Sequence, residues 1–407
     1  MNNYFCELSK NIWEDALRVE YAKNKNLSVY TVVDGIVIPP QKGDAFQPDG
    51  PIFGWGGVAD SIGNPIELSL QKAQGMRNRV EGKKINIDDI SQSDDSTVIY
   101  LNFFIKQWGH YLLDVIGRLW YAIKEDINTK IVYTCFKDEN CTIDGNYLEL
   151  LELLGIQRDR MICVNAPTRF RKVIIPESAI YPGSYYTAEY KELFDEIVGR
   201  CVTEANITPE KNIYCSRALL PNNGKEIGEK RIESIFIQNN FTSIHMEKMS
   251  LRNQIIAINS AKMIAMVNGS LAHNLLFLRH DCPVIIINKT YRVNVHQVMI
   301  NQISCVNAVY VDAYVAPMPV LYGMGPFIMS VTDEFKLFAK KMNIKIPSSY
   351  VNYALSHKEK VMYYMKWILT YKKFILKGKA IEEGGYDIPY RTIRKYYKNN
   401  ELKKDNE

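Results

Sequence analysis

The chain has 407 residues, of which 47% are hydrophobic, 23% charged and 11% aromatic. This composition is typical of a globular protein with two or three domains, and it excludes disordered, collagen-like and coiled-coil chains. The net charge of +5 is unevenly distributed: residues 355–407 carry 13 Lys/Arg and 7 Asp/Glu, so the first 354 residues sum to −1. A nucleic-acid-binding surface is therefore not expected on the body of the protein.

The eight cysteines are expected to be reduced core residues, because no two have the C-x-x-C spacing of a zinc or redox site. The N-terminus lacks the pattern of a signal peptide, and no apolar stretch approaches 18 residues. These features predict a cytoplasmic protein.

The first part of the chain is predicted to be rich in β-structure. Short strands and turns punctuated by Gly and Pro are expected over 27–70, followed by an exposed polar loop at 88–95 and a strand over 98–104. Alternating helices and strands follow, over about 110–125, 131–134, 147–154, 161–164 and 173–176.

The clearest α/β pattern lies between residues 212 and 289. Strands are predicted over 213–216, 242–245, 263–267 and 284–287, and helices over 229–239, 251–261 and 271–278. This alternation is typical of a parallel, doubly wound sheet, which binds ligands at the carboxyl ends of its strands. We therefore predict two α/β halves with a nucleotide crevice between them.

A polar stripe begins the helix predicted at 110–125. His110 and Asp114 are four residues apart and share one helical face, which Arg118 continues one turn later. Either Asp114 or His110 could accept a proton from an attacking hydroxyl. The alternative is a local structural network of the three side chains.

Two strand ends carry groups suited to an anion. Arg217 follows the strand at 213–216 and could pair with phosphate. Gly269 and Ser270 separate a buried strand from a helix, where backbone N–H groups can approach an anion, although Ser270 serves equally well as an N-cap. The chain has no Asp-x-Asp triplet to clamp a divalent metal, so phosphate charge is expected to meet Arg, Lys and helix dipoles.

Taken in order, these segments resemble glycosyltransferase family 61, which includes capsular polysaccharide biosynthesis enzymes. Residues 109–114 (GHYLLD) and 118–120 (RLW) resemble its G-H-x-L-x-D/E…R-L signature, and 213–217 (IYCSR) resembles its I-Y-I-S-R strand. Further matches are Arg231, Gln254, Ala261, Gly269, Ser270 and the segment 274–277 (NLLF). The agreement extends over about 98–289.

The chain also departs from the family pattern. Asn268 replaces the histidine before the glycine, and Leu271 replaces a second glycine. The strand 284–288 lacks the acidic residue that often holds the donor ribose, for which Asn288 and Lys289 are candidate substitutes.

The resemblance implies a GT-B fold and an inverting, metal-independent sugar transfer from a nucleotide-sugar donor, expected to be UDP-linked, with no cofactor. It implies an acceptor-side domain at 1–170, a donor-binding domain at 171–305, and return helices with a basic tail at 306–407. The predicted donor-binding residues are Arg217, Arg231, Gly269, Ser270, His273, Asn274 and Lys289. On the acceptor side, Asp114 and His110 are the expected catalytic residues and Arg118 a neighbouring contact.

The tail is basic and amphipathic. Residues 358–379 have apolar side chains at helical spacing between lysines, which suits either an anionic membrane surface or a helix packed back across both halves. We favour packing for the front of this segment and an exposed basic arm after Tyr390. Peripheral contact with the inner face of the cell membrane and homodimerisation are left open.

The predicted function is transfer of a hexosyl or pentosyl group to a hydroxyl of a surface polysaccharide precursor, carried on an oligosaccharide or a lipid-linked glycan. Two alternatives keep the fold. One is a pyruvyl- or phosphosugar-type transferase that modifies polysaccharide, and the other is a degenerate transferase that serves as a scaffold in polysaccharide assembly.

Overall fold

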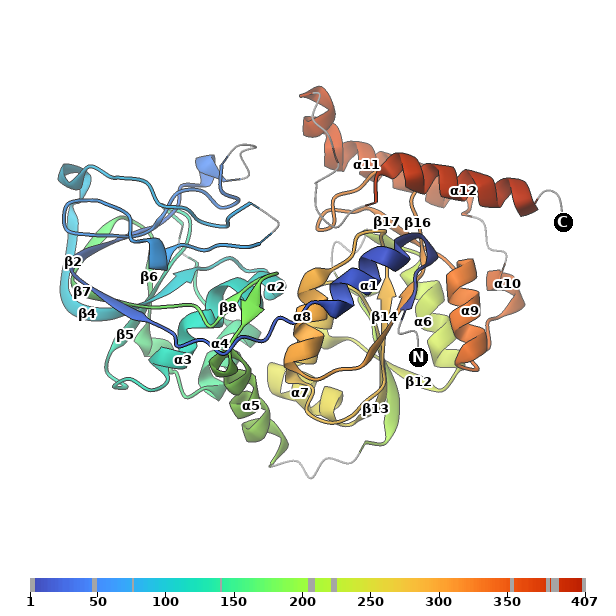
Figure 1. Cartoon of the computed structure of the whole chain (residues 1–407), viewed down its shortest axis with the longest axis horizontal. Coiled ribbons are helices and arrows are strands. Elements are labelled where there is room, and N and C mark those ends of the chain that lie inside the picture. The colour runs from blue at the N-terminus through green and yellow to red at the C-terminus, as the bar shows by residue number, and fades with distance from the viewer. Residues whose placement is uncertain are drawn as a thin grey trace.

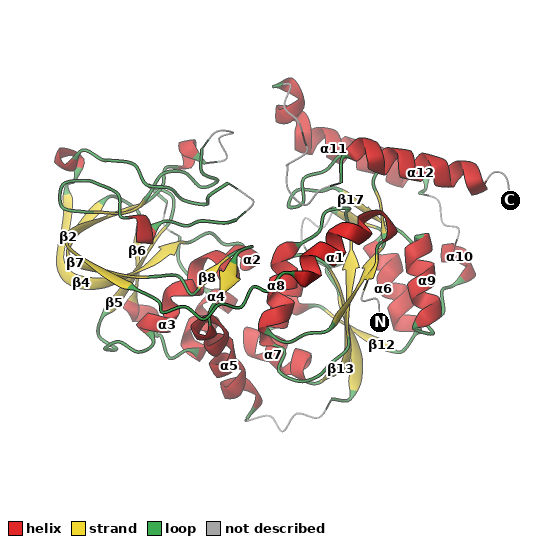
Figure 2. Ribbon diagram, viewed as in Figure 1, coloured by secondary structure: helices red, strands yellow, loops and turns green. Residues whose placement is uncertain are grey.

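The computed structural model describes residues 4–45, 50–74, 77–139, 141–203, 209–220, 225–351, 355–377, 381 and 388–404. It is a mixed α/β protein with a six-stranded sheet in each half (Figure 1). Helices α6 and α9 cover one face of the C-terminal sheet, and α1, α7 and α8 cover the other (Figure 2). The helices are α1 (Lys10–Arg18), α2 (Trp108–His110), α3 (Leu119–Ala122), α4 (Gly145–Leu153), α5 (Ala188–Val202), α6 (Glu229–Gln238), α7 (Leu251–Asn259), α8 (Val295–Ile303), α9 (Asp333–Lys341), α10 (Ser348–Val351), α11 (His357–Leu376) and α12 (Tyr390–Lys404).

The C-terminal sheet is entirely parallel, as the alternation of strands and helices predicts. Its strand order is β1-β15-β14-β13-β10-β12. The strands are β1 (Tyr4–Phe5), β10 (Lys211–Cys215), β12 (Phe241–Ile244), β13 (Ala261–Val267), β14 (Val284–Asn288) and β15 (Ala308–Asp312). The winding direction reverses between β10 and β13, and in doubly wound sheets the ligand crevice lies beside this reversal, outside the carboxyl ends of the strands.

The N-terminal sheet is mixed. Its order is β3-β2-β7-β4-β5-β6, with β7, β4, β5 and β6 parallel and β2 antiparallel to both of its neighbours. The strands are β2 (Val29–Ile38), β3 (Gly57–Ala59), β4 (Gln92–Phe103), β5 (Lys130–Thr134), β6 (Met161–Val164) and β7 (Thr168–Pro176). The loop predicted at 88–95 is wrong from Gln92 onward, because β4 begins there. The first residues of β4 are exposed, as predicted for this polar stretch.

Five short strands form smaller sheets beside the two main ones. They are β8 (Ile180–Tyr181), β9 (Tyr185–Tyr186), β11 (Glu226–Ile227), β16 (Tyr314–Val315) and β17 (Phe327–Met329).

The helix predicted at 110–125 is interrupted. Helix α2 is followed by a π-helical turn, η5 (Tyr111–Val115), a 3₁₀ turn, η6 (Ile116–Arg118), and then α3. The carbonyl of Asp114 accepts hydrogen bonds from the side-chain amides of Gln71 and Asn102, both 2.7 Å away, which satisfies a group that the irregular winding exposes. Such π turns are often found at functional sites.

The division between the halves differs from the predicted boundaries. Position 170 falls inside β7 of the N-terminal sheet, and β15, beyond residue 305, belongs to the C-terminal sheet. The beginning of the chain also joins the C-terminal half, because β1 pairs with β15 and the ring of Trp13 lies 4.1 Å from that of Tyr310. These long-range pairings leave no local sequence signal.

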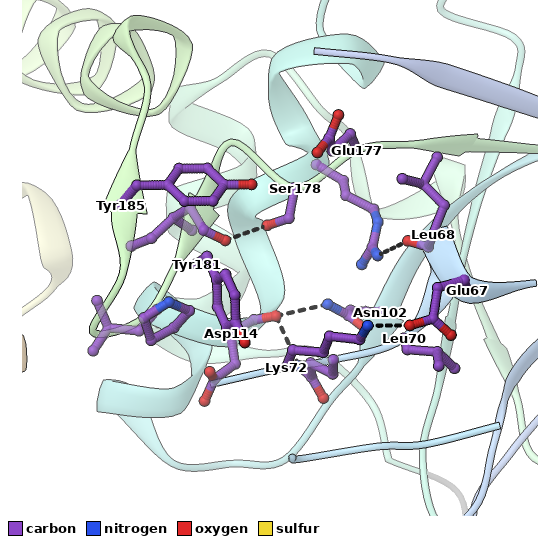
Figure 3. A pocket seen from close by; sticks show the side chains of 15 residues that line it. Glu67, Leu68, Leu70, Lys72, Asn102, Asp114, Glu177, Ser178, Tyr181 and Tyr185 are labelled. Carbon is purple, nitrogen blue, oxygen red and sulfur yellow. Dashed lines mark hydrogen bonds and ion pairs between the residues drawn. The ribbon is translucent and has the colours of Figure 1, made fainter. Parts of the chain in front are cut away.

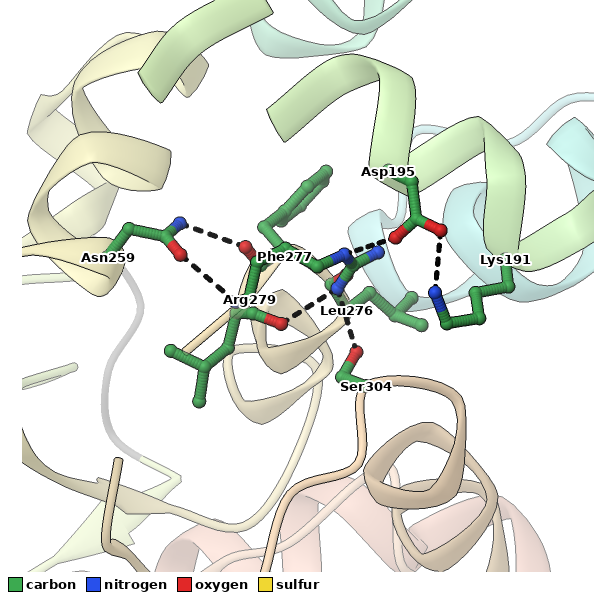
Figure 4. A network of polar contacts seen from close by, with 8 residues as sticks. Lys191, Asp195, Asn259, Leu276, Phe277, Arg279 and Ser304 are labelled. Atoms are coloured by element: carbon green, nitrogen blue, oxygen red, sulfur yellow. Dashed lines mark hydrogen bonds and ion pairs between the residues drawn. The ribbon is translucent and has the colours of Figure 1, made fainter. Parts of the chain in front are cut away.

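The two halves are held together by polar and apolar contacts. The Arg279 guanidinium bonds Asp195 of α5 at 2.5 Å and also the Leu276 carbonyl at 2.7 Å (Figure 4). The Glu149 carboxylate of α4 accepts from the backbone N–H groups of Leu251 and Arg252, at 2.7 and 3.0 Å, and so caps α7 of the other half. One continuous apolar cluster includes residues of both sheets.

The C-terminal helices pack onto the C-terminal half alone, as far as the described contacts show. Tyr363, Trp367 and Tyr371 of α11 are buried there, and the Trp367 indole donates to the Pro319 carbonyl at 2.7 Å. The arm predicted after Tyr390 is helix α12, which buries Ile393; residues 405–407 lie outside the described part.

All eight cysteines are unpaired and five of them are buried, in agreement with their predicted role as core residues. Within the described ranges, no helix is both long enough and apolar enough to cross a bilayer.

Candidate functional site

Five side chains meet where the two halves adjoin, and we call them the junction cluster. They are Arg79, His110 and Asp114 from the N-terminal half and His273 and His296 from the C-terminal half. Asp114 Oδ2 lies 2.5 Å from His110 Nδ1 and 3.4 Å from Arg79 Nε. The predicted His110–Asp114 pair is therefore present.

Asp114 is held as a carboxylate. Its side chain is 2% exposed, and burial alone would raise its pKa, but Arg79 and His110 outweigh burial and lower the pKa below its ordinary value. His110 is more accessible, with 29% of its side chain exposed. The pair thus combines a buried anion with an imidazole that solvent or a ligand can reach.

The two histidines of the C-terminal half are neutral at physiological pH. Burial lowers the pKa of His273 to about 3, and electrostatic interaction with the imidazoles of His296 and His110 lowers it further. Burial and the Arg79 guanidinium lower the pKa of His296 to about 4. A neutral imidazole can accept a proton or a hydrogen bond at its unprotonated nitrogen.

Three buried polar atoms of this cluster have no hydrogen-bond partner among the described residues. They are Asp114 Oδ1, His273 Nδ1 and His296 Nε2. Buried polar atoms are nearly always satisfied in native proteins, so an unsatisfied group requires an explanation. Three such atoms in one electrostatically coupled cluster mark a region where a polar ligand would complete the hydrogen bonding.

Close packing across the junction depends on Gly109. A Cβ at this position would lie 3.0 Å from both His273 Nδ1 and Ser270 Oγ. Beside it, the Trp108 indole donates to Asn274 Oδ1 at 2.5 Å. Asn274, predicted to bind the donor, is 2% exposed and instead joins the two halves.

A second group of charged residues lies at the carboxyl ends of β10, β13 and β14, and we call it the strand-end cluster. It consists of the four charged residues Arg217, Glu226, Glu229 and Lys289, together with Gly269 beside them. Glu226 Oε1 lies 2.5 Å from Lys289 Nζ and 3.7 Å from Arg217 Nε. The Arg217 backbone N–H donates to Glu229 Oε1 at 2.8 Å.

Gly269 brings its backbone close to Lys289. A Cβ at residue 269 would lie 3.4 Å from Lys289 Nζ, and its φ of +151° is one that side-chain-bearing residues rarely adopt. The helix that follows is the six-residue 3₁₀ helix η9 (Ala272–Phe277), not the α-helix predicted at 271–278. The fold therefore gathers the cations Arg217 and Lys289 here, rather than the N-terminus of an α-helix.

The acids of this cluster are not equivalent. Burial tends to raise the pKa of Glu226, but Lys289 and Arg217 outweigh it and keep that carboxyl ionised. Burial raises the pKa of Glu229 to about 7, and neighbouring Glu226 adds to the rise. Burial also lowers the pKa of Lys289. Near neutral pH, Glu229 can therefore take up or release a proton in response to nearby charge.

Strand β14 has no acidic residue, but Asp312 of the neighbouring strand β15 lies beside its end. Asn288 at the end of β14 donates to Asp312 Oδ1 of β15 and accepts from Asn268 Nδ2, both at 2.9 Å. Burial raises the pKa of Asp312 to about 7. Asn288 and Asp312 are 2% and 5% exposed, so this set of hydrogen bonds is buried at the strand ends.

Arg118 and Arg231 are occupied by structural contacts. The Nε, Nη1 and Nη2 atoms of Arg118 each donate to a backbone carbonyl, at 2.8, 2.9 and 2.6 Å. The irregular turns after Asp114 direct Arg118 into the sheet, so it does not continue the His110–Asp114 face as the sequence predicts. Arg231 pairs with Glu359 of α11 at 2.7 Å and so fastens that helix.

A cavity of about 420 Å³ adjoins the junction cluster on the N-terminal side. Figure 3 shows Tyr181 and Tyr185 along one side of it and Glu67 and Leu70 along the other. Its lining also includes Gln71, Lys72, Asn102, Asp114, Arg118 and Glu177. Aromatic rings beside carboxylates and amides suit a polyhydroxylated ligand.

The sequence interpretation missed Arg79, His296, Glu226 and Glu229. The first two lie in segments without a motif, and they reach Asp114 only through the fold. Glu226 and Glu229 both come after the predicted Arg217 in the chain, but nothing in their sequence spacing indicates that both side chains would be buried. The local signal available was only that Glu229 begins a predicted helix.

Comparison with known proteins gives one family match. Residues 108–285 match the family model described as Glycosyltransferase 61. No curated protein sequence matches the chain significantly. The matched segment contains the His110–Asp114 pair, Arg217 and the Gly269 turn. This part of the chain is therefore similar to glycosyltransferase family 61, in agreement with the resemblance that the sequence indicates, and the similarity supports a glycosyltransferase.

Proposed function

We propose that the protein is an inverting, metal-independent glycosyltransferase with a GT-B arrangement, which transfers a sugar from a nucleotide donor to a hydroxyl of a capsular or other surface polysaccharide precursor. The observation that carries the proposal is the buried Asp114 carboxylate, whose Oδ1 has no partner among the described residues and which interacts electrostatically with His273 and His296, each with one unsatisfied ring nitrogen. The family implies the sugar transfer, and the mechanism and the substrates are inferred from these residues.

In the proposed reaction, Asp114 takes the proton of the acceptor hydroxyl while the oxygen attacks the anomeric carbon from the side opposite the leaving group. His110, 2.5 Å away, orients the carboxylate and can share the proton. An acceptor hydroxyl at Oδ1 would supply the missing hydrogen bond. Inversion follows from this single displacement, because the base acts on one face of the sugar and the nucleotide leaves from the other.

The acceptor glycan is proposed to lie in the cavity lined by Tyr181 and Tyr185. Gln71 Oε1 and Asn102 Oδ1 line the same cavity, are buried, and have no partner among the described residues. Their amide nitrogens already hold the Asp114 carbonyl. Sugar hydroxyls could donate to both oxygens, which would couple acceptor binding to the position of the base.

The nucleotide diphosphate is proposed to bind at the strand-end cluster. Arg217 and Lys289 supply two positive charges at the sheet's reversal point, and the Gly269 backbone leaves room beside them. Charge developing on the leaving phosphate would be stabilised by these cations. Because Glu229 has a pKa near 7, an arriving diphosphate would favour its protonated form and so reduce repulsion.

The test separates chemistry from donor binding. In Asp114→Asn, turnover with a nucleotide-sugar donor and a glycan acceptor should fall by about 10²–10⁴-fold, the usual contribution of a general base. Donor-induced thermal stabilisation, measured with EDTA present, should persist in Asp114→Asn and disappear in Arg217→Ala.

The Asn variant leaves the buried Arg79 without its anion, so its folding is checked by circular dichroism and its melting temperature before turnover is interpreted. Wild-type turnover in Asp114→Asn would disprove the base assignment. A cooperatively melting protein that no nucleotide sugar stabilises, with or without acceptor, would favour the scaffold alternative.

A further inference from the structure

Helix α11 has an apolar stripe on its exposed side. Val361, Tyr364, Met365, Ile368, Leu369, Ile375 and Leu376 are 44, 44, 59, 54, 72, 49 and 75% exposed. Their spacing of one, three and, between Leu369 and Ile375, six residues places them along one side of the helix, over about 22 Å at 1.5 Å per residue, with the exposed Lys372 in the longer gap on that side. Single exposed apolar residues need no explanation, but a stripe of this extent marks an interaction surface.

The stripe is held outward by the packing of the opposite side. Tyr363, Trp367 and Tyr371 are 1, 7 and 0% exposed, and the Tyr371 hydroxyl accepts from the Leu321 backbone N–H at 2.8 Å. At the start of the helix, Ser356 and Glu359 form a reciprocal capping box, and Glu359 pairs with Arg231. The helix is therefore already ordered and cannot turn its apolar stripe inward.

The charges around the stripe are almost all positive. Exposed lysines on or directly after α11 are Lys358, Lys360, Lys372, Lys373 and Lys377, and exposed bases on α12 are Arg391, Arg394, Lys395 and Lys398. The one acidic side chain within 357–377, Glu359, is paired with Arg231. The two helices run across the outer edge of the C-terminal half, away from the N-terminal sheet (Figure 1).

We propose that α11 docks the protein on the surface of an anionic lipid bilayer, with the stripe from Val361 to Leu376 lying among the acyl chains and the flanking bases against the headgroups. Apolar burial and attraction to anionic lipid together are the known requirements of an interfacial helix. A second copy of the chain fits less well, because apposing two α11 helices would bring their lysines together, and the one acid of 357–377, Glu359, is already paired with Arg231.

The docking surface goes beyond the proposed function, because it lies apart from the junction and strand-end clusters. It is therefore tested without any transfer reaction. The full chain is sedimented with vesicles of neutral phosphatidylcholine, and with vesicles in which about a third of the lipid is phosphatidylglycerol. Binding is expected to the anionic vesicles only, and to weaken several-fold between low and physiological salt.

The deciding variant replaces the two central stripe residues, Ile368→Ser with Leu369→Ser. Its binding to anionic vesicles should fall at least tenfold while its melting temperature stays at the wild-type value or above, because both side chains are exposed. The matched control is Leu337→Ser on α9, 63% exposed, which should bind as wild type does.

Three outcomes would overturn the proposal. They are equal binding to neutral and anionic vesicles, unchanged binding of the double variant, and a concentration-dependent dimer that the double variant abolishes while the wild type ignores vesicles. A failed vesicle assay would leave donor binding and turnover unaffected, so it is distinguishable from failure of the transferase proposal.

Discussion

The pKa of Glu229 links the stability of the protein to pH. Burial holds this carboxyl near pKa 7 in the folded protein, against 4.5 for an ordinary glutamate. Folding therefore favours the protonated form of Glu229. The stability that this protonation contributes is lost as the pH rises from about 4.5 through 7. Asp312, with its pKa also raised by burial to about 7, acts in the same direction.

Glu229→Gln should accordingly stabilise the protein at alkaline pH. The amide keeps an oxygen to accept from the Arg217 N–H, but it cannot ionise. At pH 8 the free energy of unfolding should rise by up to about 3 kcal/mol, at 1.36 kcal/mol per pKa unit, and the gain should vanish near pH 5. Urea denaturation of both proteins at pH 5, 6.5 and 8 measures it, and a pH-independent difference would contradict the pKa.

The same reasoning with opposite sign applies to the junction histidines. His273 and His296 stay neutral in the folded protein, with pKa values of about 3 and 4, whereas an unfolded histidine titrates near 6.5. Stability contributed by these residues is therefore lost as the pH falls below about 6.5. Glu229 and Asp312 thus reduce the stability of the folded protein at alkaline pH, and His273 and His296 reduce it at acidic pH. Residues of the candidate site therefore help to set the pH at which the protein is most stable.

At the scale of elements, the contact of α2 with η9 depends on one missing side chain. A methyl group at Gly109 would lie 3.0 Å from His273 Nδ1 and Ser270 Oγ, so Gly109→Ala must displace the turn by a few tenths of an ångström. We expect about a tenfold loss of kcat with a modest loss of stability, because this turn joins the junction and strand-end clusters. Steady-state kinetics and thermal melts distinguish the two effects.

Gly199, in the interior of α5, provides the matched control. A Cβ at this position meets nothing within 4 Å, so Gly199→Ala should stabilise the protein by about 0.5–1 kcal/mol through helix propensity and leave kcat unchanged. Unchanged kcat in Gly109→Ala would show that the turn tolerates the displacement.

Elements defined by local pattern could be predicted from the sequence, and those defined by distant contacts could not. Within 212–289 the strands matched to within about two residues, because each apolar run is short and separated by a helix of ordinary length. The π turn at Tyr111–Val115 escaped prediction, because its residues have helical spacing and only the tertiary contacts of the Asp114 carbonyl show the irregularity.

The candidate site follows the same division. His110, Asp114, Arg217, Gly269 and Lys289 were predicted, since they adjoin predicted strand ends or share a helical face. Their partners were not predicted, because no motif marks their positions. Arg79 comes from a loop and Glu226 from the short strand β11, whereas Glu229 and His296 lie in the first turns of α6 and α8. Arg118 lines the cavity, but its spacing from Asp114 did not indicate that its guanidinium would also bond three backbone carbonyls.

For the whole molecule, we expect a single unfolding transition. The apolar cluster that includes Ile99 and Leu101 of β4 also includes Ile264 and Ile286 of the C-terminal sheet. Separating the halves would expose this shared core and break the Arg279–Asp195 contact. Calorimetry should therefore give equal calorimetric and van't Hoff enthalpies in the ligand-free protein.

Glu149→Ala sharpens this expectation. It removes a carboxylate that caps α7 from the opposite half, a change worth about 1 kcal/mol at a helix N-terminus. The one transition should move to lower temperature without splitting. Two resolved transitions in either protein would show that the halves unfold independently.

The pairing of β1 with β15 also constrains how the protein is made. Cys6 at the end of β1 contacts the carbonyl of Tyr310, 304 residues later in the chain. At about 5–20 residues per second, a ribosome reaches β15 roughly 15–60 s after it has synthesised β1. Throughout that time, α1 carries Trp13 without the surface that will bury it. Strand β1 and helix α1 therefore find their place late, and the C-terminal sheet gains its edge strand only after β15 has been synthesised.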